Sequence, residues 1–396
     1  MEFNKKMLDN GLTVIHEKRD VPVTTVMLAV KYGSAYEDAK EKGIAHFIEH
    51  LCFKGTEKRN TKEIAESLEK VGGTLNAFTS EEMTAYHVKL PSKHLGLAMD
   101  VIFDIFFNPV FPEEEVKKEA NVICEEIRMY NDNPRAHVME RIKSCLYESP
   151  FGMFIAGTEE NVGGMTREKL IEKHRRVYSP ENAILCVVGN NNFEEILKLA
   201  EDFSVSRGMN RVNEQVIKKI NLKLKEKREG IQQVNIAIGF HFPKFSDKDR
   251  YAAEVFTTIL GDGMSSKLFT EVREKRGLAY AVKADIGSGK NYGYMIIFIG
   301  TDKKNEEEAI RICLEEMKKM ENTSLKELEE AKQQVLGSYD VDAESSNDRA
   351  VNLILEEVSG KAEDYLDYAN NINKVDLEDL KKLARFEDYS CFSLVP

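Results

Sequence analysis

Two histidines and a glutamate stand close together in the segment His46-Phe47-Ile48-Glu49-His50. On a helix, side chains three and four residues apart share one face, so His46, Glu49 and His50 are expected to project together. Two imidazoles one turn apart can bind a zinc ion at about 2.0–2.1 Å. A carboxylate beside them can take a proton from the metal-bound water. The order His-x-x-Glu-His is the inverted zincin signature, and a helix and a third ligand are needed to confirm it.

The expected helix Glu113–Tyr130 supplies candidates for the third ligand. At 100° per residue, Glu119 falls about 20° from Glu126, while Val122 and Ile123 lie about 40° and 60° from the same direction. Both carboxylates are therefore expected to point toward an apolar face, where burial is costly unless a cation meets them. A zinc ion held by the two histidines would supply that cation. The alternative is a solvated acidic face, because further glutamates crowd this helix.

Periodicity and capping signals predict the elements that position these side chains. The N-terminal residues predict a hairpin, and the motif helix is expected to begin near Gly43. Thr61 is the expected cap of the following helix, Thr61–Val71, which Gly72-Gly73 ends. The other elements expected in the first half are strands at 23–31, 74–80, 84–90 and 183–188, and helices at 95–107 and 193–203.

Length, composition and charge exclude several classes of protein. A chain of 396 residues is too long for one ordinary core, so two domains are expected. No apolar run approaches the roughly 20 residues of a membrane span, and no signal peptide is recognisable, so a cytoplasmic location is expected. The net charge of −12 argues against a nucleic-acid surface. Six scattered cysteines without a Cys-x-x-Cys pair are expected to be reduced thiols, not zinc ligands.

The second half of the chain repeats the plan of the first. A strand at Val234–Phe242 is the equivalent of the strand at 23–31. A helix at Tyr251–Leu260 is the equivalent of the motif helix at an offset of about 208 residues, but it lacks the metal-binding trio. The segment Asn347-Asp348-Arg349-Ala350 also echoes Asn133-Pro134-Arg135-Ala136. A duplication is indicated in which only the first copy kept the ligands. The expected division is a catalytic domain at 1–208, a connection at 209–224 and a similar domain without metal at 225–396.

Several longer motifs resemble those of the pitrilysin/insulysin clan of zinc peptidases. The closer resemblance is to its half-length branch, which includes mitochondrial processing peptidase and bacterial relatives. It runs through most of the chain. The segments that carry the resemblance are His46–Thr56, Leu75–Ser80, Val122–Ile127, Gly157–Asn161, Gly263–Phe269 and Glu271–Tyr280.

The resemblance implies a role for each residue of the metal site. His46, His50 and Glu126 would bind zinc, one ion per chain. Glu49 would be the general base, and Glu119 would support the site from outside the ligand set.

Residues elsewhere are implied to bind the substrate. Asn76, Ala77 and Phe78 match the edge strand onto which a peptide adds as a further strand. Arg273 and Tyr280 match the pair that holds the substrate backbone near the scissile bond. Without the resemblance, Arg273 is equally well explained as an ordinary arginine on a helix surface.

The fold expected from the resemblance is α+β, with two similar domains that each contain a mixed sheet backed by helices. Together they would form half of a peptidase chamber. We therefore expect a zinc-dependent endopeptidase of peptides or unfolded segments, in a homodimer where Arg273 and Tyr280 act in trans. Neither a nucleic-acid partner nor a membrane is expected. Two alternatives stay open: a non-catalytic peptide-binding or partner subunit, and another metal hydrolase that shares only the inverted motif.

Overall fold

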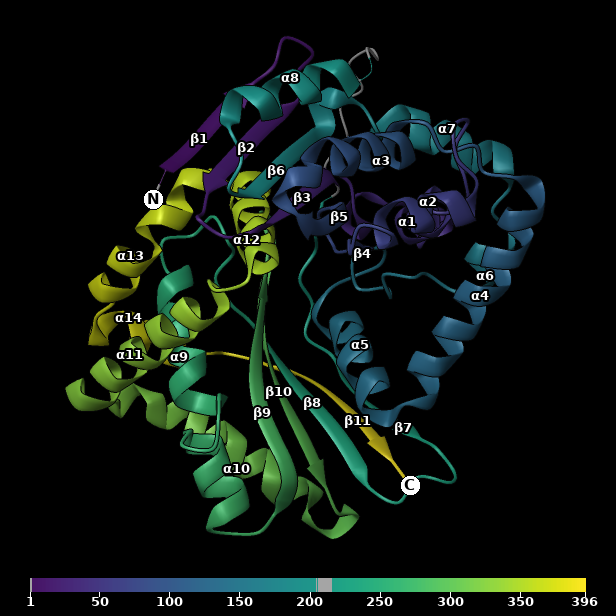
Figure 1. Ribbon diagram of the computed structural model, residues 1–396. Helices are drawn as coiled ribbons and strands as arrows, with labels where there is room; N and C mark the ends of the chain where they lie inside the picture. Colours follow the sequence, from purple (N-terminus) through teal and green to yellow (C-terminus); the bar gives the residue numbers. More distant parts are fainter. Residues whose placement is uncertain (1, 204, 206–215) are drawn as a thin grey trace. The chain divides into compact units, whose positions relative to one another are not determined.

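A hairpin begins the first sheet, as the N-terminal sequence predicts. The computed structural model describes residues 2–203, 205 and 216–396. The first sheet has the strand order β1-β2-β6-β3-β5-β4, and β2–β6 is its parallel pair (Figure 1). Its strands are β1 (Glu2–Met7), β2 (Thr13–Lys18), β3 (Val23–Val30), β4 (Thr74–Thr79), β5 (Thr84–Pro91) and β6 (Ala183–Gly189).

The middle of this sheet is buried on both faces. Along β3, Val26 and Leu28 belong to the main core, whereas Met27 and Ala29 are fully buried without belonging to it. Successive side chains of a strand point to opposite faces, so a strand covered on both sides is apolar throughout. Helices α3 and α8 pack together over one face, and α12 packs on β3 and β6 (Figure 1). The helices of this part are α1 (Ile44–Cys52), α2 (Thr61–Glu69), α3 (Leu95–Phe107), α4 (Glu113–Asp132), α6 (Glu159–Gly163), α7 (Arg167–Val177), α8 (Phe193–Phe203) and α12 (Ser346–Ser359).

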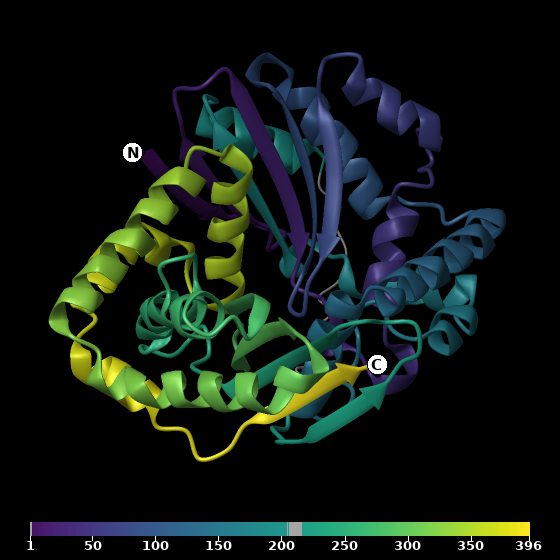
Figure 2. The ribbon, with the colours of Figure 1, turned by 90° about the horizontal axis from the view of Figure 1, so that it is seen from below.

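The second sheet has the strand order β7-β11-β8-β10-β9. Its parallel pair joins β7 to the C-terminal strand β11, which Figure 2 shows in yellow. The two mixed sheets, each backed by helices, confirm the predicted α+β fold. The elements of this part are the strands β7 (Lys223–Lys227), β8 (Val234–His241), β9 (Ala279–Ser288), β10 (Gly293–Thr301) and β11 (Ser390–Val395), and the helices α5 (Pro134–Leu146), α9 (Arg250–Gly261), α10 (Glu306–Lys319), α11 (Leu325–Asp342), α13 (Tyr368–Lys374) and α14 (Leu377–Ala384).

Each sheet is covered by one helix from the other half of the sequence. Helix α5 packs on β8 and β11 of the second sheet, whereas α12 packs on the first. The two echoed segments begin these helices, and Asn133 caps α5 by accepting from two backbone N–H groups. The chain accordingly divides into one unit of residues 1–127, 154–215 and 342–365 and another of residues 128–153, 216–341 and 366–396.

Two local predictions are wrong. The cap of α2 is Asn60, not Thr61, because the Asn60 side chain and Glu63 bond to each other's backbone N–H groups in a capping box. On α4, Ile123 is fully buried but Val122 is 49 % exposed. The helical angles placed Val122 and Ile123 on opposite sides of Glu126, and only the Ile123 side packs on the core.

Three further predictions concern the chain as a whole. The six cysteines are free thiols, five of them buried. Every helix among the described residues is too short or too polar to span a lipid bilayer. Residues 209–215 of the predicted connection lie outside the described residues, and β7 begins at Lys223.

Candidate metal centre

A buried cluster holds the first turn of α1 in place. Gly43 caps the helix with φ +96°, and a Cβ there would lie 2.3 Å from the carbonyl oxygen of Ala156, so this position requires glycine. The Glu37 carboxylate accepts hydrogen bonds from the N–H groups of Gly43 (3.0 Å) and Ala45 (2.7 Å). Lys42 Nζ lies 3.9 Å from the same carboxylate. These contacts satisfy two of the free N–H groups at the start of the helix and fix its direction.

Three potential ligand atoms meet where α1 faces α4. The Nε2 atoms of His46 and His50 each lie 3.7 Å from Oε2 of Glu126, and the two imidazole centroids are 4.7 Å apart. The three ligand atoms lie within 4.8 Å of one another. Two ligands of a tetrahedral zinc ion are about 3.3 Å apart, so the two 3.7 Å distances are slightly wider than those between ligands closed around an ion. Two imidazoles and one carboxylate also match the donors of catalytic zinc sites, so these residues fit the metal.

No second group of this kind exists among the residues that the structure describes. Burial, together with the neighbouring His50, lowers the pKa of His46 to about 3. The His46 imidazole is therefore neutral near pH 7, which is the form that binds a metal.

A chain of two contacts supports His50 from behind. Nδ1 of His50 lies 3.0 Å from Oε2 of Glu119, and Lys54 Nζ lies 2.7 Å from Oε1 of the same carboxylate. Burial acts to raise the pKa of Glu119, but the contacts with His50 and Lys54 outweigh it and lower the pKa. An ionised Glu119 accepts the Nδ1–H of His50, which leaves Nε2 free to bind a metal.

Glu49 stands on the same helix and is held by a neighbouring strand. Its side chain is buried, and the Thr79 hydroxyl of β4 donates a 2.5 Å hydrogen bond to Oε2. Burial raises the pKa of Glu49, and the bond from Thr79 opposes that shift. The carboxylate thus has one fixed oxygen and an environment that favours uptake of a proton.

The predicted peptide-binding strand β4 lies at the edge of its sheet, since β5 is its one neighbour among the strands that the structure describes. The Ser80 N–H donates to Met83 O at 2.8 Å. Along an antiparallel strand every second residue bonds to the neighbouring strand, so the backbone groups of Ala77 and Thr79 point away from β5. In agreement, the Ala77 N–H is accepted by the Asn76 side chain at 2.8 Å. On the same pattern, the side chains of Asn76 and Phe78 lie on the face of β4 opposite to Thr79.

Arg273 and Tyr280 belong to the other unit, and both lie on irregular backbone. Arg273 is exposed within a π-helical turn, Phe269–Glu274, and its guanidinium lies 4.7 Å from the Phe269 ring centroid. Tyr280 is 49 % exposed and is the extra residue of a β-bulge, because Ala281 pairs with Gly300 and Ala279 with Thr301. π-Helical turns and bulges occur frequently at functional sites.

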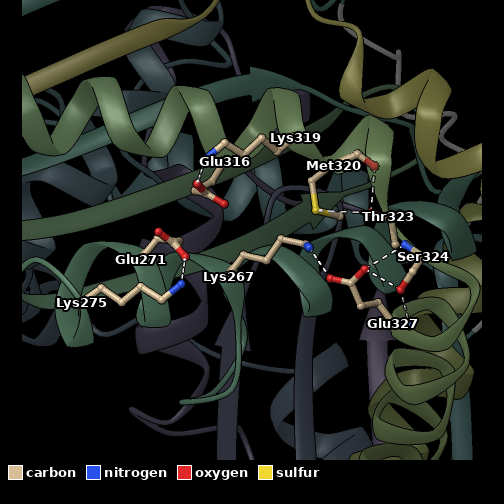
Figure 3. Close-up of polar contacts among 9 residues, drawn as sticks. All are labelled: Lys267, Glu271, Lys275, Glu316, Lys319, Met320, Thr323, Ser324 and Glu327. Atoms are coloured by element: carbon tan, nitrogen blue, oxygen red, sulfur yellow. Dashed lines mark hydrogen bonds and ion pairs between the residues drawn. The ribbon is translucent and has the colours of Figure 1, made fainter.

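Ion pairs hold the segment that carries Arg273 (Figure 3). Lys267 bonds to Glu327, which also accepts from the Ser324 N–H at 2.8 Å. Within the segment, Glu271 bonds to Lys275 at 2.5 Å. These contacts connect the turn to α11 and fix it locally.

The structure adds Lys54 and Thr79 to the residues that the sequence predicted. Both are separated in sequence from the carboxylates they contact, so no helical spacing links them. A signal for Lys54 was present, however, since it lies inside the longest motif, four residues after His50.

Two family models together match most of the chain. A model described as insulinase (peptidase family M16) matches residues 12–159, and one described as peptidase M16 inactive domain matches residues 164–335. The first match contains every residue of the candidate centre, and the second contains Arg273 and Tyr280.

Similar proteins and structures agree with these models. An uncharacterized zinc protease of Bacillus subtilis is 33 % identical over 98 % of this chain and 97 % of its own. One from Rickettsia bellii is 34 % identical over 84 % of this chain and 82 % of its own. The crystal structure of a protease from Helicobacter pylori has the same fold, with a TM-score of 0.93 and 24 % identity over all of both chains. A peptidase M16 inactive domain from Pseudomonas fluorescens matches with a TM-score of 0.92 and 19 % identity, over all of this chain and 98 % of its own.

Proposed function

The chain belongs to the M16 insulinase family of peptidases, and we propose that it is a zinc-dependent endopeptidase. The observation that carries this proposal is the meeting of His46, His50 and Glu126 beside the buried carboxylate of Glu49. Three protein ligands leave one position open for chemistry, as catalytic zinc requires.

The residues of the site divide the chemical work among them. His46, His50 and Glu126 would hold one zinc ion, which would polarise the scissile carbonyl and lower the pKa of water toward about 7. Glu49 accepts the proton of the attacking water and passes it to the leaving amine. The Thr79 hydroxyl keeps one Glu49 oxygen in place, so the other is free for proton transfer.

The edge strand β4 suits a peptide substrate. A peptide that adds to β4 would pair with the outward backbone groups of Ala77 and Thr79, and Thr79 also holds the general base. Asn76 and Phe78 would flank that peptide. Strand addition requires an extended chain, so short peptides and unfolded segments are the proposed substrates.

Arg273 and Tyr280 are proposed to bind the substrate backbone. Their exposure and their irregular local backbone support a binding role over a packing role. We also propose that they act across a homodimer whose subunits close a chamber around the peptide, and that the protein works in the cytoplasm. Light scattering of the active protein tests the dimer: an active monomer contradicts it.

Hydrolysis of a quenched basic peptide tests the reaction itself. We expect activity in the zinc-loaded protein, loss of activity with a chelator, and recovery when Zn²⁺ is restored. Ester and phosphate substrates serve as controls, and preferential cleavage of either would favour another metal hydrolase. If the protein binds zinc but cleaves no member of a broad peptide library, the non-catalytic partner subunit becomes the better interpretation.

A further inference from the structure

We propose that Lys54 is a positioning residue that sets the zinc affinity of the site through Glu119. The inference rests on the proposed zinc function, but it concerns a residue outside the ligand set. The feature that carries it is the continuous path from Lys54 Nζ to Glu119 Oε1 (2.7 Å) and from Glu119 Oε2 to His50 Nδ1 (3.0 Å).

Contacts within the protein fix the backbone of the loop after α1, which carries Lys54, and none of them requires a metal ion. Gly55, the next residue, has φ +121°, a conformation that side chains rarely allow, and its carbonyl accepts the Val110 N–H at 3.1 Å. One residue further, the Thr56 hydroxyl donates to Asp104 at 2.7 Å, and Arg59 donates to the same carboxylate oxygen at 2.6 Å.

Asp104 lies on α3, and its side chain is 1 % exposed, so the loop is bound to the core. Lys54 is consequently presented from a fixed backbone and has little conformational freedom to lose when it pairs with Glu119.

Each carboxylate oxygen of Glu119 has its own contact, Oε1 with Lys54 and Oε2 with His50, so Lys54 can affect the orientation of His50. A glutamate carboxylate that is bonded at one oxygen only can still rotate about χ3, the torsion that turns the carboxylate, because the energy wells of χ3 are broad. With Lys54 on Oε1, that rotation is blocked and Oε2 stays directed at Nδ1 of His50. The imidazole then keeps its proton on Nδ1 and its Nε2 lone pair toward Glu126.

Burial makes the pair effective. The side chains of Lys54 and Glu119 are 24 % and 7 % exposed, so water screens their attraction less than it screens a surface pair. Lys58 in the same loop provides the contrast: it is 59 % exposed and lies 3.6 Å from Asp100. Replacing either lysine by methionine removes the same charge from the same loop, but only Lys54 contacts Glu119.

The test is the dissociation constant for Zn²⁺, measured by competition with a chromophoric chelator on the full chain. Partners behind metal-binding histidines typically contribute about 10- to 100-fold in affinity, so we expect Lys54→Met to weaken binding about tenfold. Lys58→Met is expected to stay within about twofold of the wild type. Equal affinities for Lys54→Met and the wild type would overturn the proposal.

A second measurement establishes the route through Glu119. In a Glu119→Gln background, Lys54→Met is expected to have no further effect on zinc affinity, whereas an undiminished tenfold loss would mean that Lys54 acts independently of Glu119. Circular dichroism of each metal-free variant checks the fold. If Lys54→Met misfolds, Lys54→Arg replaces it in the test; this variant keeps a donor and is expected to retain most of the zinc affinity. A wild type that binds no zinc would reject the proposed function together with this inference. If the wild type binds zinc and Lys54→Met binds it equally well, the inference alone is rejected.

Discussion

Helices α1 and α9 occupy the same place in the two halves of the chain, since each follows a buried strand, but of the two only α1 presents candidate metal ligands. Strand β3 leads to α1, and β8 leads to α9. The offset of about 208 residues places Glu254, Thr257 and Thr258 where α1 has His46, Glu49 and His50.

The polar groups of α9 are satisfied by protein partners. The Tyr368 hydroxyl of α13 donates to Glu254 at 2.5 Å, and the Thr257 hydroxyl donates to the Ala253 carbonyl of its own helix at 2.8 Å. The Nε2 atoms of α1 instead face a carboxylate at 3.7 Å. One arrangement of strand and helix therefore gives a packed core when other protein groups satisfy its polar side chains. It gives a candidate metal centre when those side chains face one another.

The largest expected effect comes from removing a candidate ligand of α1. The equivalent residue of α9 serves as the control. We expect His50→Ala to weaken zinc binding by more than about 100-fold, because a direct ligand matters more than the groups behind it. Thr258→Ala should leave zinc content unchanged. Elemental analysis after dialysis measures both, and zinc loss in Thr258→Ala would break the distinction between the helices.

A smaller effect is expected from the hydroxyl that holds the general base. Thr79→Val should lower kcat about tenfold while zinc content stays the same, because Glu49 loses its fixed orientation. Thr79→Ser keeps the hydroxyl and should recover most of the rate. A valine variant as fast as the wild type would show that the Thr79–Glu49 bond has no role in turnover.

The Tyr368 hydroxyl, which holds a buried carboxylate in the other unit, should affect stability alone. Tyr368→Phe leaves Glu254 without that donor, and the expected loss is about 1–3 kcal/mol in the free energy of unfolding. Urea denaturation measures the loss, and the peptide assay should show unchanged kcat. A fall in kcat with full zinc occupancy would contradict a purely structural role for this contact.

The smallest expected effect is on the pH dependence of stability. Burial raises the pKa of Glu254, while Tyr368 and Arg250 act in the opposite direction. Between the pKa of the unfolded chain, about 4.3, and the raised value, the folded state holds more protons, so this group makes the free energy of unfolding fall as pH rises.

Glu254→Gln removes that dependence. Its stability should therefore fall less than that of the wild type when the pH is raised above about 4.3. Parallel curves for the two proteins would contradict a raised pKa for Glu254.

Periodic elements were predicted well because their signals are local. Helices α3 and α8 begin and end where the sequence predicts, at Leu95–Phe107 and Phe193–Phe203. The meeting of Glu126 with α1 also followed from helical geometry together with the resemblance.

Features that depend on distant contacts could not be predicted in this way. Helical angles could not decide which side of Glu126 is buried, so Val122 was misplaced. The bulge at Tyr280 depends on its pairing with β10, where a Cβ on Gly300 would lie 2.4 Å from the tyrosine ring. Thr79 and Lys54 reach their carboxylates only after the sheet and the loop have folded.

The most direct test of the central claim is a paired measurement on Glu49→Gln, with zinc content and peptide hydrolysis determined on the same preparation. The account predicts about one zinc ion per chain and a rate lowered by at least about 100-fold, because the ligands remain and the general base is lost. A variant that keeps its zinc and hydrolyses peptide at the wild-type rate would contradict the role assigned to Glu49.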